Sequence, residues 1–359
     1  MPDLMHVGLL YGGLSSEHDV SVRSARNVAR ALDPDRFRVT PIWISREGRW
    51  HVQDGLAALL GEADEAGPAA PLSPADARGP LLRDAADGLA RLRLDVVFPM
   101  LHGQNGEDGS VQGLLKTLGL PYVGPDVLSS AVCMDKDVAK RLLHGAGVPV
   151  TPSLTVRAHE RGGLAYAAVV EQLGTPLFVK PANSGSSVGT SKVEDEAAFR
   201  PALDEAFRYD RKVLIETAIV GREIECAVLG NEAPEASAPG EIVSTAQFYT
   251  YDAKYEDPDA SRMEVPADLP PETAERVRQL AVEAYRVLGC EGMARVDFFV
   301  TEESDVLLNE VNTIPGFTER SMYPVMWAHA GLDLPALVGR LVDLALERHR
   351  RDAALLTTR

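Results

Sequence analysis

An apolar segment near the C-terminal end carries two polar side chains that need a partner. Residues 306–312 read VLLNEVN, an extended-chain pattern that includes Glu310 and Asn312. A buried carboxylate is unfavourable unless it is paired or bound to a metal ion. Residues 294–300, ARVDFFV, precede this segment, and the polar run TEES separates them from DVLLNEVN at residues 305–312. The two segments are therefore predicted to form a β-hairpin.

The register of this hairpin decides which side chains meet. A turn of about four residues would pair Thr301 with Val306, and this register sets Asp297 opposite Glu310. Two opposed carboxylates repel each other in an ordinary sheet, and a divalent cation between them removes the repulsion. Asp, Glu and Asn oxygens are hard ligands that Mg²⁺ accepts. An acidic patch at a solvated strand end explains the pair equally well from these residues alone.

The same register fixes the rest of the hairpin. It sets Arg295 opposite Asn312 and on the same face as Asp297, so that Arg295 could neutralise an acidic patch. On the second segment, four alternating residues are predicted to share one face: Val306, Leu308, Glu310 and Asn312.

The segment VKPANSGSSVG, residues 179–189, is a second candidate site. A strand ending at Lys180 is followed by a Gly- and Ser-rich loop, whose N–H groups and hydroxyls could bind phosphate oxygens. The lysine precedes the glycines, so the loop is not a Walker A motif, and no Gly-x-Gly-x-x-Gly fingerprint follows a strand. A flexible turn is the alternative, and the lysine at the strand end argues against it.

Other polar residues each have an ordinary explanation. Lys136 is a surface lysine unless it meets the same pocket, and His102 fits a hydrogen-bonded loop histidine. Glu17, near the first Gly-Gly turn, is also explained as favourable charge at a helix N-terminus. Glu216 ends the apolar run VLIET, where a link between strands could hold an adenine ring. The polar, aromatic segment at residues 248–259 is more often an exposed loop than a lid.

The apolar pattern predicts the scaffold that positions these candidates. Strands are expected at residues 5–13, 37–44 and 94–103, and helical spacing of apolar residues is found within residues 15–32 and 109–120. This alternation predicts a parallel sheet in a doubly wound unit. Residues 52–94, rich in Ala, Gly, Pro and Asp, are predicted to be a surface insertion with helical pieces.

Composition sets the protein class. The 359 residues allow two or three packed units, and a formal net charge of −17 argues against non-specific binding to nucleic acid or anionic membranes. No apolar run is long enough to cross a bilayer and the start lacks a basic signal-peptide head, so a cytoplasmic location is expected. Cys133, Cys226 and Cys290 show neither disulfide nor metal-ligand spacing and are expected to be small buried residues.

Together these stretches resemble D-alanine–D-alanine ligases of the ATP-grasp superfamily. The motifs GGLSSEHDVSV, HGQNGEDGSVQGLL, MDKDVAK, VKPANSGSSVG, AKY, ARVDFF and NEVNTIPGFTERS occur in the family's order. The resemblance covers nearly the whole chain outside residues 52–94. It implies an α/β fold, α+β in the C-terminal half, with a Rossmann-like unit at residues 1–124. A central ATP-grasp subdomain at 125–216 and a C-terminal one at 217–359 would follow.

The resemblance also implies roles for single residues. Those expected to bind ATP are Lys136, Lys180, Ser184, Gly185, Ser187, Gly189, Glu216, Ala218, Ile219, Glu223 and Lys254. Those expected to bind two Mg²⁺ ions, for which Mn²⁺ would substitute, are Asp297, Glu310 and Asn312. Those expected to hold two D-alanine molecules are Glu17, His102, Tyr255, Arg295, Gly316, Ser321 and Met322. Those expected to act in catalysis are Glu17, Ser186, Tyr255, Arg295 and Gly316.

The implied reaction is ATP-dependent formation of D-alanyl-D-alanine through a D-alanyl phosphate, with release of ADP and phosphate, for peptidoglycan precursor synthesis. Tyr255 favours the dipeptide, since related ligases that make the D-alanyl–D-lactate ester tend to carry Phe there. The segment at residues 249–262 would close as a lid, and a homodimer is expected. The alternatives are an ATP-grasp ligase with another acceptor and a nucleotide-binding regulator without catalysis.

Overall fold

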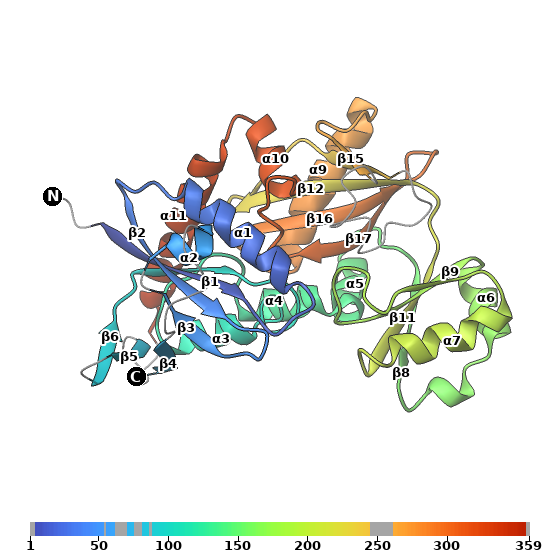
Figure 1. Cartoon of the computed structure of the whole chain (residues 1–359). Helices are drawn as coiled ribbons and strands as arrows, with labels where there is room; N and C mark the ends of the chain where they lie inside the picture. Colours follow the sequence, from blue (N-terminus) through green and yellow to red (C-terminus); the bar gives the residue numbers. More distant parts are fainter. Residues whose placement is uncertain are drawn as a thin grey trace.

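The structure is a computed structural model that describes residues 4–53, 55–61, 70–74, 81–85, 88–244 and 261–356. Within these residues the strands form three sheets of seven, four and six strands (Figure 1). None of the helices in the described ranges is long and apolar enough to span a membrane.

The seven-stranded sheet belongs to the N-terminal unit, and its strand order is β6-β5-β4-β3-β2-β1-β7. The three parallel strands are β1 (Met5–Gly12), β2 (Phe37–Ile44) and β7 (Val96–Met100). Helix α1 (His18–Ala31) covers one face and α3 (Ser110–Thr117) the other. The predicted doubly wound parallel core is therefore confirmed.

The segment at residues 52–94 differs from the prediction. An antiparallel series extends the sheet, and its strands are β3 (Trp50–Val52), β4 (Ala70–Pro74), β5 (Leu81–Ala85) and β6 (Gly88–Leu92). The only helix there among the described residues is the single turn α2 (Ala57–Leu60). The expected helical pieces are mostly strands, because pairing to an existing sheet edge outweighs the weak local preference of an Ala- and Gly-rich sequence.

The four-stranded sheet is antiparallel, and its order is β10 (Ser191–Val193), β9 (Leu177–Pro181), β11 (Lys212–Thr217) and β8 (Ser153–Arg157). It has its own core with α6 (Tyr166–Leu173) and α7 (Glu196–Ala206), and the 3₁₀ turn η1 (Arg161–Gly163) precedes α6. Lys180 pairs with Leu214 and Phe178 with Glu216. Alternation therefore puts Lys180 and Glu216 on the same face, away from the helices.

The six-stranded sheet forms the centre of the C-terminal half. Its path is β15 (Ser261–Glu264), β14 (Gly240–Ser244), β12 (Arg222–Gly230), β16 (Gly292–Val300) and β17 (Val306–Asn312), and β13 (Glu235–Ala236) pairs with β12. One face packs on α4 (Val127–Met134), α5 (Lys136–Gly145) and α9 (Pro271–Val287). Helices α4 and α5 thus share the core of this sheet, although the expected boundary at residue 125 assigned them to the central unit.

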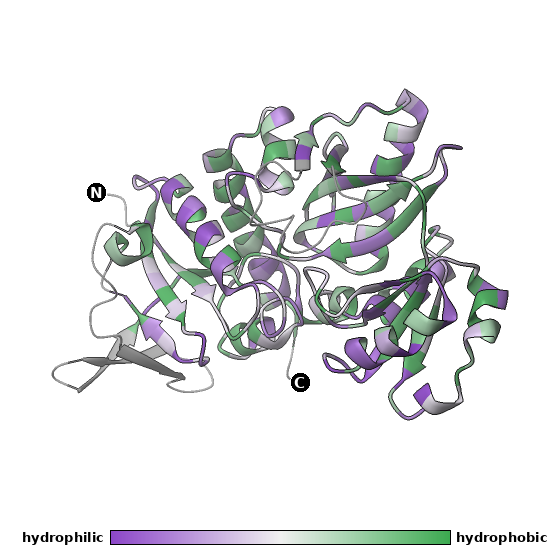
Figure 2. Ribbon diagram, turned by 45° about the vertical axis from the view of Figure 1, so that its right-hand side comes forward, coloured by the Kyte–Doolittle hydropathy of each residue, from purple (hydrophilic) through white to green (hydrophobic). Residues whose placement is uncertain are grey.

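The other face of the six-stranded sheet joins the N-terminal unit in one core. Helices α10 (Met322–His329) and α11 (Leu334–Ala353) lie between the two, and the Phe98 ring meets the Phe317 ring edge-on at 6.4 Å. The buried Arg348 on α11 donates to the Tyr122 carbonyl at 2.7 Å. Figure 2 shows the hydrophobic residues concentrated along strands and inward helix faces. These contacts fix the N-terminal unit against the C-terminal half.

All three cysteines are buried and free, as the sequence predicts. The Sγ atoms of Cys133 and Cys290 lie 3.6 Å apart in the core beneath the six-stranded sheet.

Candidate active site

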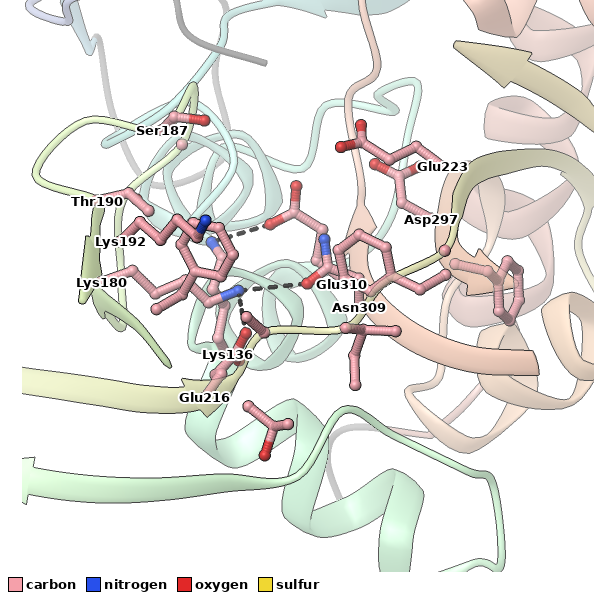
Figure 3. A pocket seen from close by; sticks show the side chains of 18 of the residues that line it. Lys136, Lys180, Ser187, Thr190, Lys192, Glu216, Glu223, Asp297, Asn309 and Glu310 are labelled. Atoms are coloured by element: carbon pink, nitrogen blue, oxygen red, sulfur yellow. Dashed lines mark hydrogen bonds and ion pairs between the residues drawn. The ribbon is translucent and has the colours of Figure 1, made fainter. Parts of the chain in front are cut away.

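A cavity of about 430 Å³ lies between the four-stranded and six-stranded sheets. Its volume is in the range of small-molecule sites. Figure 3 shows Lys180 and Lys192 on one wall, and Glu223 and Asp297 on the other. The predicted site residues that line it are Lys136, Lys180, Ser184, Gly185, Ser186, Ser187, Glu216, Ala218, Ile219, Glu223, Asp297 and Glu310.

Glu216 lies at the base of the cavity between two lysines. Its carboxylate forms ion pairs with the Lys140 Nζ at 2.6 Å and with the Lys180 Nζ at 2.7 Å. All three side chains are largely buried. Burial raises the pKa of Glu216, but the two ammonium groups outweigh burial and leave that pKa below its usual value. Burial lowers the pKa of Lys140 to about 8. The base of the cavity thus carries a surplus positive charge when both lysines are protonated.

Lys136 joins two walls of the cavity. Asp135 caps helix α5 by accepting from the Val138 N–H at 3.1 Å, and Lys136 is the first helical residue after it. The Lys136 Nζ donates to the Ser184 carbonyl at 2.7 Å and lies 3.2 Å from a Glu310 carboxylate oxygen. Lys136 is therefore a buried pocket residue, and the alternative of a surface lysine is wrong.

The hairpin brings together the residues proposed as metal ligands. Strands β16 and β17 pair Asp297 with Glu310 and Arg295 with Asn312, as the sequence predicts. At the turn, however, Val306 pairs with Val300 rather than with Thr301. A β-bulge restores the predicted register further along, because the register shifts between Asp297 and Phe298 and leaves Asn309 without a partner opposite.

The bulge also changes which side chains of β17 face the cavity, so the predicted face of this strand is wrong in part. Val306 and Leu308 lie in the core with Val311, whereas Asn309 and Glu310 line the cavity. The four residues expected on one face are therefore divided between two faces, because the extra residue inverts the alternation. The Asn309 Oδ1 accepts from the Lys180 Nζ at 3.3 Å.

Arg295 is buried among acidic groups next to the cavity. Its Nε and Nη2 donate to the two Asp297 oxygens at 2.8 and 2.7 Å, and its Nε lies 3.0 Å from the Glu225 carboxylate. Asn312 also donates to Asp297, at 2.9 Å. Burial alone would lower the pKa of Arg295, but Asp297 and Glu225 raise it well above its usual value. Arg295 is thus a fixed positive charge.

The Gly- and Ser-rich loop reaches across to the N-terminal unit. The Ser186 hydroxyl donates to Glu17 at 2.5 Å, and Glu17 is a buried residue at the start of α1. A side chain at Gly185 would place its Cβ 3.0 Å from the Glu17 carboxylate, and one at Gly103 would place it at 2.8 Å. Close packing of the loop on Glu17 therefore depends on both glycines. Gly189 does not line the cavity; its backbone lies against Tyr209.

The residues that follow β17 do not line this cavity, although the predicted site residues Gly316, Ser321 and Met322 are among them. A Cβ at Gly316 would come within 2.7 Å of the Ser321 hydroxyl, and this hydroxyl accepts from the Thr318 N–H at 2.9 Å. Ser321 precedes α10, and the Met322 side chain is buried in the core, so only the Met322 backbone is left for a ligand. His102 binds protein atoms through both ring nitrogens, the Ile314 carbonyl at 3.0 Å and the Ser24 hydroxyl at 3.2 Å.

Two predicted site residues, Lys254 and Tyr255, lie outside the described residues, as does most of the segment expected to form a lid. Their roles stay predictions.

Two family models match the chain. One, described as the D-ala D-ala ligase N-terminus, matches residues 6–125, and one for the D-ala D-ala ligase C-terminus matches residues 142–343. The chain belongs to the D-alanine–D-alanine ligase family. This family consists of ADP-forming, ATP-dependent ligases with the ATP-grasp fold, so the resemblance and the fold class inferred from the sequence are confirmed.

Full-length relatives agree with this assignment. The D-alanine–D-alanine ligase A of Chromobacterium violaceum is 52% identical over 98% of each chain, and that of Escherichia coli K12 is 51% identical over 99% of each. Among solved structures, the D-alanine–D-alanine ligase of Coxiella burnetii has a TM-score of 0.86 at 41% identity, covering 97% of each chain. The VanG D-Ala:D-Ser ligase of Enterococcus faecalis has a TM-score of 0.85 at 35% identity, covering 96% of this chain and all of the other.

The side chains around the hairpin fit a magnesium site that is completed by nucleotide. Asp297, Glu310 and Asn312 supply two carboxylates and an amide oxygen. Within the described ranges, no group of three or more His, Cys, Asp or Glu side chains is arranged to hold a metal ion. Mg²⁺ is usually held by one or two carboxylates together with phosphate oxygens and water. This donor set therefore suits metal ions that enter with ATP.

Sequence reasoning missed three residues of this region. Lys140 lies one helical turn after Lys136, and Glu225 lies two residues after Glu223 on the same strand, so spacing alone could have placed both near the site. Asn309 had no such signal, because it faces the cavity only through the bulge.

Proposed function

We propose that this protein joins two D-alanine molecules to D-alanyl-D-alanine, converting ATP to ADP and phosphate. The observation that carries the proposal is the position of Lys136, whose ammonium contacts the Gly- and Ser-rich loop and Glu310 in one cavity. Cationic phosphate-binding groups and hairpin carboxylates meet there, next to the buried Arg295. This is the arrangement that phosphoryl transfer to a carboxylate requires.

The nucleotide would lie between the two sheets. Glu216 and the backbone at Ala218 and Ile219 line the cavity and would hold the adenine, and Glu223 would hold the ribose. Lys136 and Lys180, with the N–H groups of residues 184–187, would bind the phosphates. The two Mg²⁺ ions that we assign to Asp297, Glu310 and Asn312 would supply charge neutralisation on the phosphate oxygens.

In the first step the carboxylate of one D-alanine attacks the γ-phosphorus of ATP, which forms a D-alanyl phosphate and ADP. Glu17 would bind the ammonium group of this substrate, since its carboxylate is buried and faces the loop through Ser186. The role of the protein in this step is positioning and charge neutralisation, because the transferred group carries most of the charge.

In the second step the neutral amine of another D-alanine attacks the acyl carbon. A tetrahedral oxyanion forms, and Arg295 and the Gly316 N–H would stabilise it before phosphate leaves. Ser321 and Lys254 would hold the carboxylate of the second substrate, and Tyr255 would join Ser186 and Glu17 in closing the site. Closure by residues 249–262 would exclude water, which otherwise hydrolyses the acyl phosphate.

Phosphate release tests this function. The protein should release phosphate from ATP only when Mg²⁺ and D-alanine are both present, and one dipeptide should form for each phosphate. Mn²⁺ should replace Mg²⁺. Phosphate release that does not depend on D-alanine would contradict the proposal, and binding of ADP without any turnover would favour a nucleotide-binding regulator.

The acceptor is a separate question, because a D-Ala:D-Ser ligase has nearly the same fold. We propose D-alanine as the acceptor, on the basis of the relatives that share about half of this sequence. Competition between D-alanine, D-serine and D-lactate, followed by mass spectrometry of the product, tests this choice. Preferred formation of the D-serine dipeptide or the D-lactate ester would reverse it.

The cellular setting is proposed on the same basis. The dipeptide would serve peptidoglycan precursor synthesis in the cytoplasm, and the protein would act as a homodimer. Light scattering coupled to size-exclusion chromatography tests the dimer against the chain mass of 38.7 kDa. The net charge of −17 gives no reason to propose a nucleic-acid or membrane partner.

A further inference from the structure

The segment from Ile314 to Phe317 connects β17 to the helix α10 and contains Gly316. Both of its ends are bound by side chains of the N-terminal unit. The Ile314 N–H donates to Glu107 at 3.0 Å, and the Ile314 carbonyl accepts from His102 at 3.0 Å. These two bonds fix the peptide groups on either side of Ile314. Their partners, Glu107 and His102, lie in the N-terminal unit, more than 200 residues earlier in the sequence.

The other end of the segment is bound in the same way by helix α1. The Phe317 N–H donates to the Ser24 hydroxyl at 3.1 Å, and the Phe317 carbonyl accepts from the Asn27 amide at 2.8 Å. Ser24 and Asn27 are three residues apart and so lie on one face of the helix. Backbone donors and acceptors at both ends of a four-residue segment are therefore satisfied by the N-terminal unit, which leaves the segment little freedom to rotate.

The hydrogen bonds of His102 and Ser24 are consistent with a single tautomer. The Ile314 carbonyl can only accept, so His102 Nδ1 carries a proton, and in the neutral ring Nε2 is then an acceptor. The Ser24 hydroxyl, 3.2 Å from Nε2, can donate to it while it accepts from Phe317. Each group in this chain of bonds has a suitable partner. Because both ring nitrogens bind protein atoms, His102 supports the segment, whereas the family resemblance implied that it binds substrate.

Glu107 links the segment to the pocket around Glu17. One of its oxygens accepts from Ile314 and the other from the Gly103 N–H at 2.8 Å. Gly103 in turn lies against the Glu17 carboxylate. Only a carboxylate can accept at both positions, because a glutamine has one acceptor oxygen and would direct its NH₂ group at an N–H. Burial and the nearby Glu17 raise the pKa of Glu107, whereas the hydrogen bonds from the Gly103 and Ile314 N–H groups oppose this shift because they favour the ionised carboxylate.

We infer that Glu107, His102, Ser24 and Asn27 are positioning residues that fix the Gly316 N–H for the oxyanion of the second step. The inference rests on the proposed function, in which this N–H stabilises the tetrahedral intermediate. The N-terminal unit then has two roles. It binds the ammonium of the first D-alanine through Glu17, and it holds the oxyanion donor, which belongs to the C-terminal half of the chain. Glu107 connects the two roles.

The substitution Glu107→Gln tests the inference, with Asp108→Asn as its matched control. Asp108 accepts two backbone N–H groups, from Asn105 in the same loop and from Ser110 at the start of α3, both at 2.9 Å, and neither bond reaches the segment from Ile314 to Phe317. A hydrogen bond to a charged group contributes about 1.5–3 kcal/mol, so we expect E107Q to lower kcat about 10- to 150-fold. The ADP dissociation constant from calorimetry should change less than about threefold in both variants, and D108N should retain most of the wild-type kcat.

A second pair of variants covers the case in which E107Q does not fold. Asn27→Ala removes the donor to Phe317 at a half-buried helical position, and Arg30→Ala changes an exposed residue of the same helix. Loss of one neutral hydrogen bond predicts a kcat about two- to tenfold lower for N27A at unchanged ADP affinity, and no change for R30A.

The outcomes separate this inference from the proposed function. If the wild type makes no dipeptide, the proposed function fails. If the wild type is active and E107Q or N27A keeps the kcat of its control, the positioning role is refuted. A parallel loss of kcat and ADP affinity in both variants would also refute it, because general destabilisation would then explain the effect.

Discussion

The hydrogen bond between Ser186 and Glu17 joins the Gly- and Ser-rich loop to the proposed D-alanine site. Because its acceptor is a carboxylate, it belongs to the charge-assisted hydrogen bonds. Such a bond contributes about 1.5–3 kcal/mol, which corresponds to about 10- to 150-fold in a rate or binding constant. Because the bond exists only when the loop lies on Glu17, Ser186→Ala should lower kcat/KM for D-alanine by this factor.

Backbone strain at Ser186 is a competing explanation for a loss of activity in S186A, and a second variant tests it. Ser186 and Ser187 adopt φ angles of 50° and 58°, which are unfavourable for residues with a side chain. Ser186→Gly removes the hydroxyl but relieves this strain. If the hydrogen bond is the important contribution, S186G and S186A should lose similar amounts of kcat/KM.

The assay is D-alanine-dependent phosphate release at saturating ATP, with ADP affinity measured by calorimetry. ADP binding should be nearly unchanged, since we assign the phosphate contacts to the loop backbone and the lysines. A kcat/KM for D-alanine within about twofold of wild type in S186A would refute the reasoning. Recovery of activity in S186G alone would assign the effect to strain.

Three further substitutions test other parts of the site. Glu310→Gln removes a hairpin carboxylate, and we expect turnover to fall at least about 100-fold and to be partly restored at high Mg²⁺. An unchanged Mg²⁺ dependence in a metal titration would contradict the metal assignment. Gly103→Ala places a Cβ 2.8 Å from Glu17 at a φ of 75°, so KM for D-alanine should rise about tenfold or more in steady-state assays, and an unchanged KM would contradict it. Lys140→Met tests the charge at the cavity base. Burial lowers the pKa of Lys140 from 10.5 to about 8, so between these pH values the unfolded chain binds more protons than the folded one. The free energy of unfolding of the wild type should therefore rise relative to K140M by on the order of 3 kcal/mol from pH 8 to 10.5 in urea titrations, and a constant difference would contradict it.

Much of the fold was predictable because it depends on local patterns. The apolar spacing of α1 and the strands β1, β2 and β7 follow from residues within a few positions of one another. The Asp297–Glu310 pair was predicted correctly although the turn register was not, because the bulge shifts β17 by one residue and compensates for the tighter turn.

The remaining features depend on contacts that a local pattern does not contain. The bulge at Asn309 inverts the alternation of β17, and no glycine or proline marks it. The strands in residues 70–92 form by pairing to the edge of an existing sheet. Glu107 looks like an ordinary loop acid in the sequence, and only the fold brings it to Ile314, 207 positions further along.

Transfer of oxygen from substrate to phosphate tests the central claim most directly. D-Alanine labelled with ¹⁸O at both carboxyl oxygens would be incubated with the protein, ATP and Mg²⁺, and the products analysed by mass spectrometry. If the carboxylate attacks the γ-phosphorus, each phosphate released should carry one ¹⁸O, and the peptide carbonyl should keep the other. Dipeptide formation with unlabelled phosphate would contradict the acyl phosphate, and with it the roles assigned to this cavity.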